Sequence, residues 1–186
     1  CVSRPRRFGK SMAANMLAAY YKRDEDTRAL FDKLMISQAQ SYKEHLNQYD
    51  VIRINMQQFL SETHSMEEML SKICNYLIQD LQEAYEQIRF REKTSLVQTM
   101  KDVFANTGHP FVILIDEWDC LFREYQQDKD AQKKYLDFLR VWLKDQDYVG
   151  LAYMTGILPI KKYGSHSALN MFIEYSMTDP GDMAQY

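Results

Sequence analysis

The chain has 186 residues, a length that suits one domain or one domain with part of another. Hydrophobic residues make up 46% and aromatic residues 13%, which supplies enough apolar surface for a core and excludes disorder as the main state. The net charge of -3 gives no bulk electrostatic argument for binding nucleic acid. No apolar run approaches the roughly 20 residues that cross a bilayer, so we expect no membrane partner.

The cysteine and histidine content argues against structural crosslinks. Cys1, Cys74 and Cys120 are an odd number with no CxxC pair, so we expect neither a disulfide framework nor a cysteine-rich zinc site, and we expect a cytoplasmic location. The four histidines lack metal-ligand spacing: His45, His64, His109 and His166. We expect one domain over residues 1–186, truncated at both ends, with residues 1–3 as the remnant of a first strand.

The first half of the chain predicts three helices and a strand. Residues 11–21 are almost all apolar, which is typical of a helix buried on every side. Residues 24–34 predict a second, amphipathic helix. Residues 51–56 are rich in β-branched side chains and predict a strand. Ser65 with Glu68 forms a capping box that opens a long helix with one apolar stripe.

The second half alternates between helices and strands. It predicts a helix from Leu96 that stops at Gly108, a fully apolar strand over 111–115, a helix over 130–144, a strand over 149–155 and a weaker strand over 171–177. This alternation implies an α/β layered fold with a mainly parallel sheet. Ligands bind such sheets at the carboxyl ends of the strands.

A basic, glycine-containing loop precedes the first predicted helix. The sequence from Arg4 to Ser11 is RPRRFGKS, and its end matches the Walker A pattern G-x-x-x-x-G-K-[ST]. In that pattern Gly9 lets the backbone approach phosphate, and the helix N-terminus holds the anion. Lys10 would bridge the β- and γ-phosphates, and the Ser11 hydroxyl would ligate Mg²⁺.

The loop also departs from that pattern, which leaves a second interpretation open. Arg4 stands where the first glycine belongs, and Pro5 stiffens the chain after it. A solvated basic turn that caps a helix explains the tripeptide Gly-Lys-Ser as well as a phosphate site does. Arg6 and Arg7 would either contact phosphates or remain surface charges.

An acidic pair ends the apolar run at 111–115. Asp116 would hold Mg²⁺, usually through water, and Glu117 would act as the general base for an attacking water. Asp119 would order the following loop. Two carboxylates that merely solvate a strand end are the alternative. A loop of this type and such an acidic strand end, in this order, arise together by chance in roughly one chain in a thousand, so coincidence explains them poorly.

Two further polar residues are candidates for phosphate sensing. Thr155 and Gly156 end the predicted strand at 149–155, where a polar residue senses the γ-phosphate in additional-strand ATPases. Thr155 would equally cap a loop through its hydroxyl, and both interpretations remain open. Asn170 is a weaker candidate.

These motifs together resemble the predicted AAA-ATPase-like family of bacteria. Residues 3–11 resemble the hallmark loop of that family, in which arginine at the position of Arg4 is normal. Asp116-Glu117-Trp118-Asp119 resembles its Walker B element. Residues 154–158, followed by Leu169-Asn170, resemble its sensor strand and the loop after it.

The resemblance implies a P-loop NTPase fold, a three-layer sandwich whose sheet is of the additional-strand type. It implies ATP and Mg²⁺ as cofactors, allows an oligomer, and implies a C-terminal PD-D/E-x-K nuclease-like domain beyond Tyr186. Motifs and resemblance together assign nucleotide contacts to Arg6, Arg7, Phe8, Gly9, Lys10, Ser11 and Met12, metal ligation to Ser11 and Asp116, and catalysis to Lys10, Glu117 and Thr155.

Three functional hypotheses follow. The first is an ATP-binding and ATP-hydrolysing module whose cycle drives a conformational change in attached domains. The second is a switch that holds nucleotide and hydrolyses little of it. The third is a nucleic-acid-associated module that acts with the nuclease-like domain, which the acidic net charge of this chain disfavours.

Overall fold

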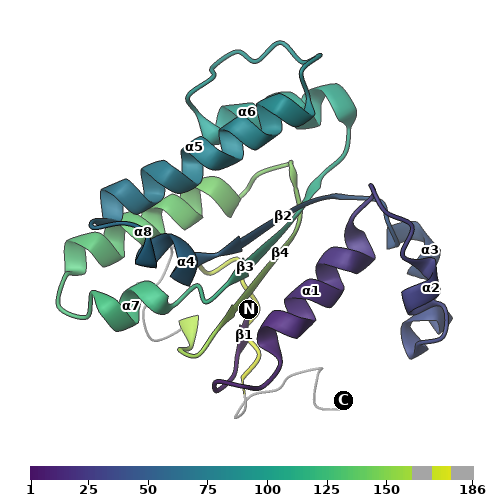
Figure 1. The fold of residues 1–186 in the computed structure, drawn as a ribbon, viewed down its shortest axis with the longest axis horizontal. Helices are drawn as coiled ribbons and strands as arrows, with labels where there is room; N and C mark the ends of the chain where they lie inside the picture. Colours follow the sequence, from purple (N-terminus) through teal and green to yellow (C-terminus); the bar gives the residue numbers. More distant parts are fainter. Residues whose placement is uncertain (161–168, 177–186) are drawn as a thin grey trace.

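The computed structural model describes residues 1–160 and 169–176. Within them a four-stranded, all-parallel sheet forms the centre of the molecule, in the order β1-β4-β3-β2 (Figure 1). The strands are β1 (Val2–Ser3), β2 (Asp50–Asn55), β3 (Phe111–Asp116) and β4 (Val149–Gly156). Because β4 lies between them, one additional strand separates β1, which leads into the basic loop, from β3, which ends in the acidic pair. The predicted α/β fold with a parallel sheet is confirmed.

The register of the strands brings their carboxyl ends to one edge. Asn55 at the end of β2 pairs with Asp116 at the end of β3, and Ile115 pairs with Met154 of β4. Every residue of β3 is buried, as its continuous apolar sequence requires for a central strand covered on both faces. The polar residues that follow β2, β3 and β4 therefore lie next to one another.

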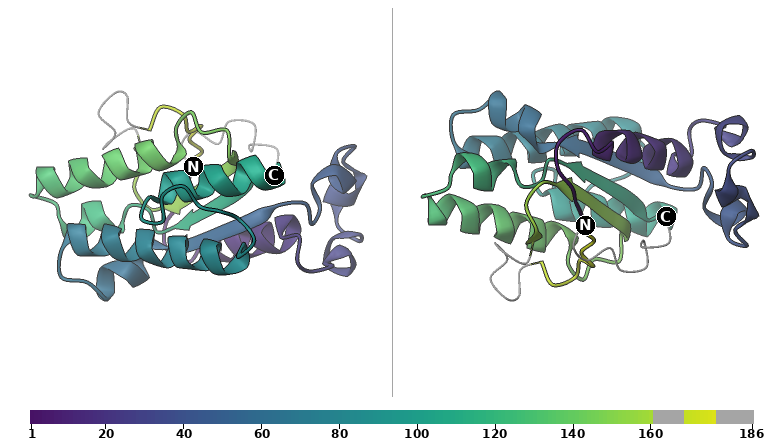
Figure 2. Two further views of the ribbon diagram at one scale, coloured as in Figure 1. Left: turned by 90° about the horizontal axis from the view of Figure 1, so that it is seen from above. Right: turned by 90° about the horizontal axis from the view of Figure 1, so that it is seen from below.

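Helices cover the two faces of the sheet, which makes three layers (Figures 1 and 2). Helix α1 (Lys10–Tyr21) packs on one face against β2, β3 and β4. The opposite face carries α5 (Met66–Ala84), α6 (Leu96–Thr107) and α8 (Lys129–Leu143), which pack against one another. The shorter helices are α2 (Arg28–Phe31), the 3₁₀ helix η1 (Met35–Gln38), α3 (Tyr42–His45), α4 (Met56–Ser61) and α7 (Cys120–Glu124).

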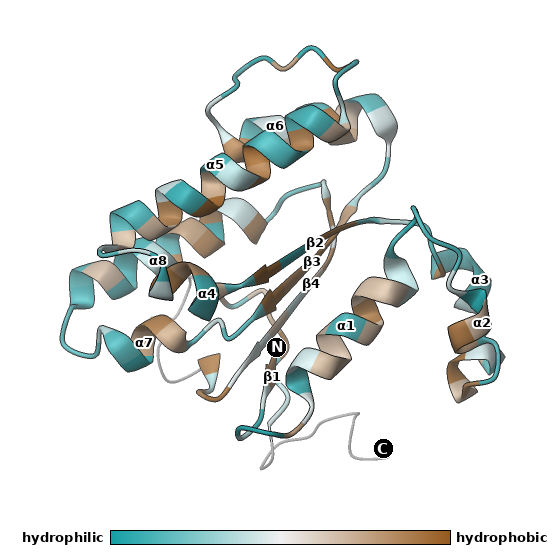
Figure 3. Cartoon of the chain, viewed as in Figure 1, coloured by the Kyte–Doolittle hydropathy of each residue, from teal (hydrophilic) through white to brown (hydrophobic). Residues whose placement is uncertain are grey.

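The main core lies between the sheet and the layer of α5, α6 and α8. Ile73, Met100 and Trp142 from these three helices are almost completely buried against the apolar strands, whose hydropathy is visible in Figure 3. A small separate cluster, formed by Tyr20, Phe31, Tyr42 and Leu46, joins the end of α1 to the projecting segment of α2 and α3. The carboxyl edge of the sheet is thus built on a rigid, packed frame.

The helix boundaries follow the local signals in the sequence. Ser65 Oγ accepts the N–H of Glu68 at 3.1 Å and starts α5, as predicted. The Glu68 carboxylate accepts the N–H of His64 at 2.8 Å rather than that of Ser65, so the capping box is displaced by one residue. Gly108 adopts a left-handed φ of 70° and ends α6, which confirms the predicted stop.

Two helix predictions were wrong in part. Helix α1 is not buried on every side, because Met12 and Met16 are 68% and 48% exposed on the face turned away from the sheet. The predicted helix over 24–34 reduces to the four residues of α2. Thr27 Oγ1 donates to the carbonyl of Ala19 at 2.8 Å, and this side-chain bond competes with a helical path through residue 27.

The weaker strand prediction over 171–177 was also wrong for the part that the structure describes. In residues 171–176 the sequence forms only an isolated bridge, between Tyr175 and Val2 at the edge of β1. Among the described helices, none has both the length and the apolar composition needed to span a bilayer.

Candidate functional site

The N-terminus of α1 is open to an anion. Gly9 precedes the helix with a left-handed φ of 72°, provides no capping side chain, and is followed by a first turn without acidic residues. The first N–H groups of a helix have no partner within it, and they carry the positive end of the helix dipole. Arg7 is also left-handed, with a φ of 68°, so the backbone turns sharply just before this N-terminus. The geometry is that of a phosphate-binding turn.

The side chain of Lys10 folds back over this loop. Its Nζ donates to the carbonyl oxygens of Arg4 and Pro5, at 3.0 and 2.9 Å, and the residue is only 8% exposed. An ammonium carries three donors, and the described residues accept two of them. Lys10 is therefore held in place with one donor left for a ligand.

A buried carboxylate joins the loop to the sheet. Ser11 Oγ donates to Asp116 Oδ2 at 2.5 Å, although the two residues are 105 positions apart in sequence. The hydroxyl of Thr155 and the N–H of Glu117 both donate to Asp116 Oδ1, the latter at 3.0 Å. Asp116 is 1% exposed, and these bonds offset the cost of burying its charge. Residues from α1, β3 and β4 thus converge on one carboxylate.

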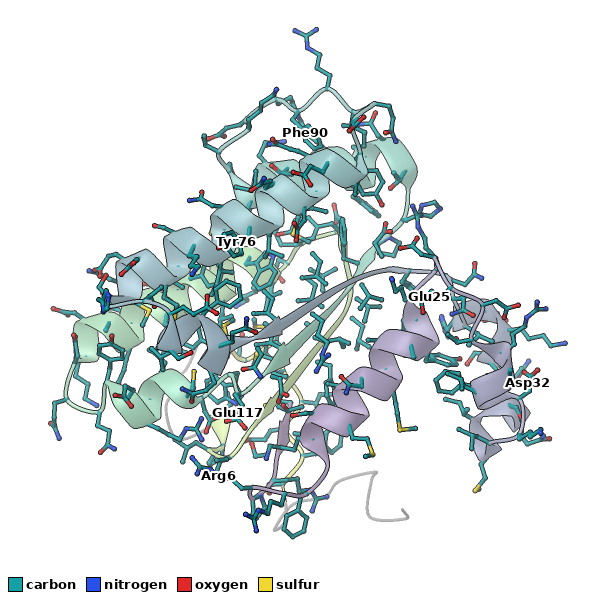
Figure 4. All side chains as sticks on the ribbon, viewed as in Figure 1. Arg6, Glu25, Asp32, Tyr76, Phe90 and Glu117 are labelled. Atoms are coloured by element: carbon teal, nitrogen blue, oxygen red, sulfur yellow. The ribbon has the colours of Figure 1, made fainter. Side chains whose placement is uncertain are left out.

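A cavity of 740 Å³ opens over this junction. The residues that line it are Arg6, Arg7, Gly9, Lys10, Ser11, Met12, Asn55, Gln57, Glu117, Arg123 and Glu124. Four of these residues are cationic and two are acidic, so the cavity favours an anion. Figure 4 shows Arg6 and Glu117 at the same end of the molecule, on the basic loop and after β3 respectively.

Glu117 is paired with a residue that the motifs do not include. Its Oε2 lies 2.6 Å from Nη2 of Arg123 on α7, and Arg123 Nε lies 3.9 Å from Asp119 Oδ2. Glu117 itself has a positive φ of 54°, which is uncommon for a residue with a side chain and turns the backbone sharply after β3. A general base at this position would begin from an ion pair.

Asp119 orders the loop that follows β4. Its Oδ2 accepts the N–H groups of Ile157 and Leu158, at 3.1 and 2.9 Å, and the residue is fully buried. The sequence had pointed to the loop after β3, so the segment that Asp119 orders differs from the one predicted. Gly156 lies against it so closely that a Cβ there would come within 2.8 Å of Asp119 Oδ1 and 2.6 Å of Trp118 Nε1. Only glycine fits at this point.

The family comparison agrees with this architecture. Residues 1–165 match the model of a family described as Predicted AAA-ATPase, and they include the basic loop, the acidic strand end and β4. The chain belongs to this predicted AAA-ATPase family. The comparisons with curated proteins and with solved structures found no match. Family membership implies nucleotide binding, and the parallel sheet flanked by helices agrees with a P-loop NTPase fold.

Not every predicted site residue of this AAA-ATPase-like chain lines the cavity. Thr155 is fully buried and its hydroxyl donates to Asp116, and neither residue is among those that line the cavity. Phe8 is 59% exposed and is not among the residues that line the cavity. Asn170 is exposed. The functional roles of these residues stay predictions.

Other lining residues escaped the sequence analysis. Asn55 lies near the carboxyl end of the predicted strand at 51–56 and is the last residue of β2, so its place at the carboxyl edge was a signal that could have been used. Its side chain caps α4 by accepting the N–H of Gln57 at 3.0 Å. Arg123 lies on α7, where no helix was predicted, so its pairing with Glu117 was not anticipated.

The donor atoms at the junction fit Mg²⁺. A hydroxyl oxygen from Ser11 and a carboxylate from Asp116 already lie in contact, and Mg²⁺ takes few protein oxygens while keeping several waters. In the described part of the chain, no group of three or more histidine, cysteine, aspartate or glutamate side chains could hold a metal by itself. Cys120 next to the site provides no nucleophile near neutral pH, because burial raises the pKa of its thiol to about 12.

A second cavity, of 420 Å³, lies at the amino ends of β2 and β3. Two of its charged side chains are paired, because Arg23 Nε lies 2.9 Å from Asp50 Oδ1, and the hydroxyl of Tyr85 donates to Asp50 Oδ2 at 2.6 Å. Ligands of parallel sheets bind at the opposite, carboxyl end. The candidate site is therefore the larger cavity at α1.

Proposed function

We propose that this chain binds ATP with Mg²⁺ and hydrolyses it, and that hydrolysis drives a conformational change in attached domains. The observation that carries the proposal is the 2.5 Å bond between Ser11 and Asp116, which joins the basic loop to the acidic strand end beside an uncapped helix N-terminus. Four cationic residues around the cavity match a polyphosphate.

Binding would use the residues of the loop. The segment from Arg6 to Met12 would surround the phosphates, with backbone N–H groups from the start of α1 and the ammonium of Lys10 as donors. Ser11 and Asp116 would hold Mg²⁺, which would neutralise charge on the β- and γ-phosphates when bound. Thr155 would hold the Asp116 carboxylate in position through its hydroxyl.

Hydrolysis would need a base beside the terminal phosphate. Glu117 would accept a proton from the attacking water, whose oxygen forms a bond to the γ-phosphorus. The bond from that phosphorus to the β–γ bridging oxygen breaks, and the products are ADP and phosphate. Lys10 would stabilise the charge on the phosphoryl oxygens during the transfer.

One observation favours a second candidate, a nucleotide switch with little hydrolysis. The carboxylate of Glu117 is already bonded to Arg123 at 2.6 Å. A carboxylate oxygen already engaged by a guanidinium is not free to accept a proton from water. Phosphate release at the background rate, together with tight nucleotide binding, would select this alternative.

The test is a titration of the intact protein with Mg-ATP, followed by a multiple-turnover phosphate-release assay. Lys10→Ala should lower the affinity at least roughly tenfold, since it removes a charge-assisted hydrogen bond to phosphate. Glu117→Gln should keep the affinity and lower the turnover by about 10²–10⁴-fold, the usual contribution of a general base.

Lys101→Ala is the matched control, because Lys101 is an exposed lysine on α6, on the opposite face of the sheet. It should leave both affinity and turnover unchanged. Equal affinities for the wild type, Lys10→Ala and Lys101→Ala would refute the proposed phosphate site.

A further inference from the structure

Arg123 occupies a place that the motifs leave unassigned. It lies on α7, six residues after Glu117, and its Nη2 contacts Glu117 Oε2 at 2.6 Å. The side chains are only 21% and 24% exposed, so water screens this pair less than a pair on the open surface. Both residues line the cavity that Lys10 and Ser11 also line. The arginine therefore belongs to the candidate site.

The other contacts of the guanidinium are weak. Nη2 lies 3.4 Å from Gln57 Oε1, and Nε lies 3.9 Å from Asp119 Oδ2, which is already engaged by two backbone N–H groups. Nη1 is buried and has no hydrogen-bond partner among the described residues. A guanidinium has five N–H donors in a rigid fork. Only the bond to Glu117 is short, so most of this donor capacity is unused.

A triphosphate in the cavity would offer this fork a better acceptor. A terminal phosphate carries more negative charge than one carboxylate and presents several oxygens, which arginine binds in bidentate geometry. Glu117 can act on a water only if the terminal phosphate lies near its carboxylate. The partner of Glu117 is then also near that phosphate.

We propose that Arg123 is a cation shared between Glu117 and the terminal phosphate of a bound nucleoside triphosphate. In the free protein it pairs with Glu117, and with triphosphate bound it also contacts the γ-phosphate. Arg123 thereby makes the site distinguish triphosphate from diphosphate. This inference rests on the proposed function, and it adds a specificity residue supplied by the same chain.

The experiment measures the affinity of the protein for a non-hydrolysable ATP analogue and for ADP, each with Mg²⁺, in the wild type and in Arg123→Ala. The affinity of Arg123→Ala for the analogue should fall roughly tenfold, equivalent to about 1.4 kcal/mol. Its affinity for ADP should stay within about twofold, because ADP lacks the phosphate that Arg123 contacts. A role in folding alone would not separate the two nucleotides.

Two further variants complete the design. Arg123→Lys keeps a cation but loses the fork, so it should lose part of the analogue affinity and none of the ADP affinity; it replaces Arg123→Ala if the latter does not fold. Arg140→Ala breaks an exposed pair with Asp137, at 2.8 Å on α8, and should change neither affinity.

The outcomes are distinct. Equal losses for the two nucleotides, or no loss for either, would overturn the role of Arg123 and leave nucleotide binding intact. Failure of the wild type to bind either nucleotide, with Lys10→Ala indistinguishable from it, would overturn the proposed function and this inference together.

Discussion

Replacing Gly156 by alanine tests how tightly the acidic strand end packs against β4. A Cβ at this position would lie 2.6 Å from Trp118 Nε1, 2.7 Å from Trp118 Cδ1 and 2.8 Å from Asp119 Oδ1. Ordinary contacts begin at 3.4 Å, so the tryptophan must move by about 0.8 Å. Trp118 and Asp119 are both fully buried, which leaves them no free space to move into.

We expect Gly156→Ala to lower the free energy of unfolding by about 3 kcal/mol. Overpacking of a dense core costs roughly 1–3 kcal/mol. A displaced Asp119 would also weaken its bonds to the N–H groups of Ile157 and Leu158, at about 1 kcal/mol each. A change of 3 kcal/mol raises the unfolded fraction more than a hundredfold. Urea denaturation of the two proteins, extrapolated linearly to water, measures it.

Gly150→Ala is the matched control on the same strand. Its Cβ would lie 3.2 Å from Pro110 Cβ and 3.3 Å from Pro110 Cγ, contacts that a shift of a few tenths of an ångström relieves. We expect a loss below about 1 kcal/mol. A loss at Gly156 equal to or smaller than the loss at Gly150 would refute the packing argument.

Three other predictions concern stability. Asp119→Ala should lower the free energy of unfolding by about 2–4 kcal/mol in thermal unfolding, because two backbone N–H groups lose their acceptor. Asp137→Ala, at an exposed ion pair, should change it by no more than about 0.5 kcal/mol, and similar losses for the two variants would contradict this. Burial raises the pKa of Cys120 from 9.0 to about 12, so the unfolded chain releases that proton first and the free energy of unfolding falls between those pH values. In Cys120→Ser the free energy of unfolding, measured by urea denaturation, should fall less steeply over this range, by about 1.4 kcal/mol per pH unit. Burial alone would raise the pKa of Asp102, but hydrogen bonds from Arg91 and Gln98 lower it below 3.8, so its contribution to stability is present above that pH and lost as pH falls through the lowered value. Asp102→Asn should therefore flatten the decline of the free energy of unfolding in acid, measured by urea denaturation at a series of pH values; a decline as steep as that of the wild type would refute this.

The strands and the long helices could be predicted because their signals are local. The apolar run before Asp116 predicted β3, and the β-branched run that begins at Val51 predicted β2. Gly108 predicted the end of α6. Two motifs more than a hundred residues apart could be assigned to one sheet edge because parallel strands align their carboxyl ends. This placed Ser11 and Asp116 in one candidate site.

The errors arose where tertiary contacts outweighed local pattern. The apolar sequence of α1 does not reveal that Met12 and Met16 remain exposed, since burial depends on which elements cover the helix. The bond from Thr27 to Ala19 and the place of α2 depend on the fold around them. Arg123 could not be linked to Glu117, because the pairing depends on the turn after β3 and on the direction of α7.

The central claim is that the basic loop and the acidic strand end bind the same Mg-nucleotide, and the dependence of ATP affinity on Mg²⁺ tests it most directly. The measurement compares wild type with Asp116→Asn, at constant ionic strength, with and without Mg²⁺. We expect Mg²⁺ to strengthen ATP binding by the wild type and to have no effect on Asp116→Asn, whose affinity for metal-free ATP should persist through Lys10 and the N-terminus of α1. The same Mg²⁺ dependence in both proteins would show that Asp116 and the loop do not meet at one nucleotide.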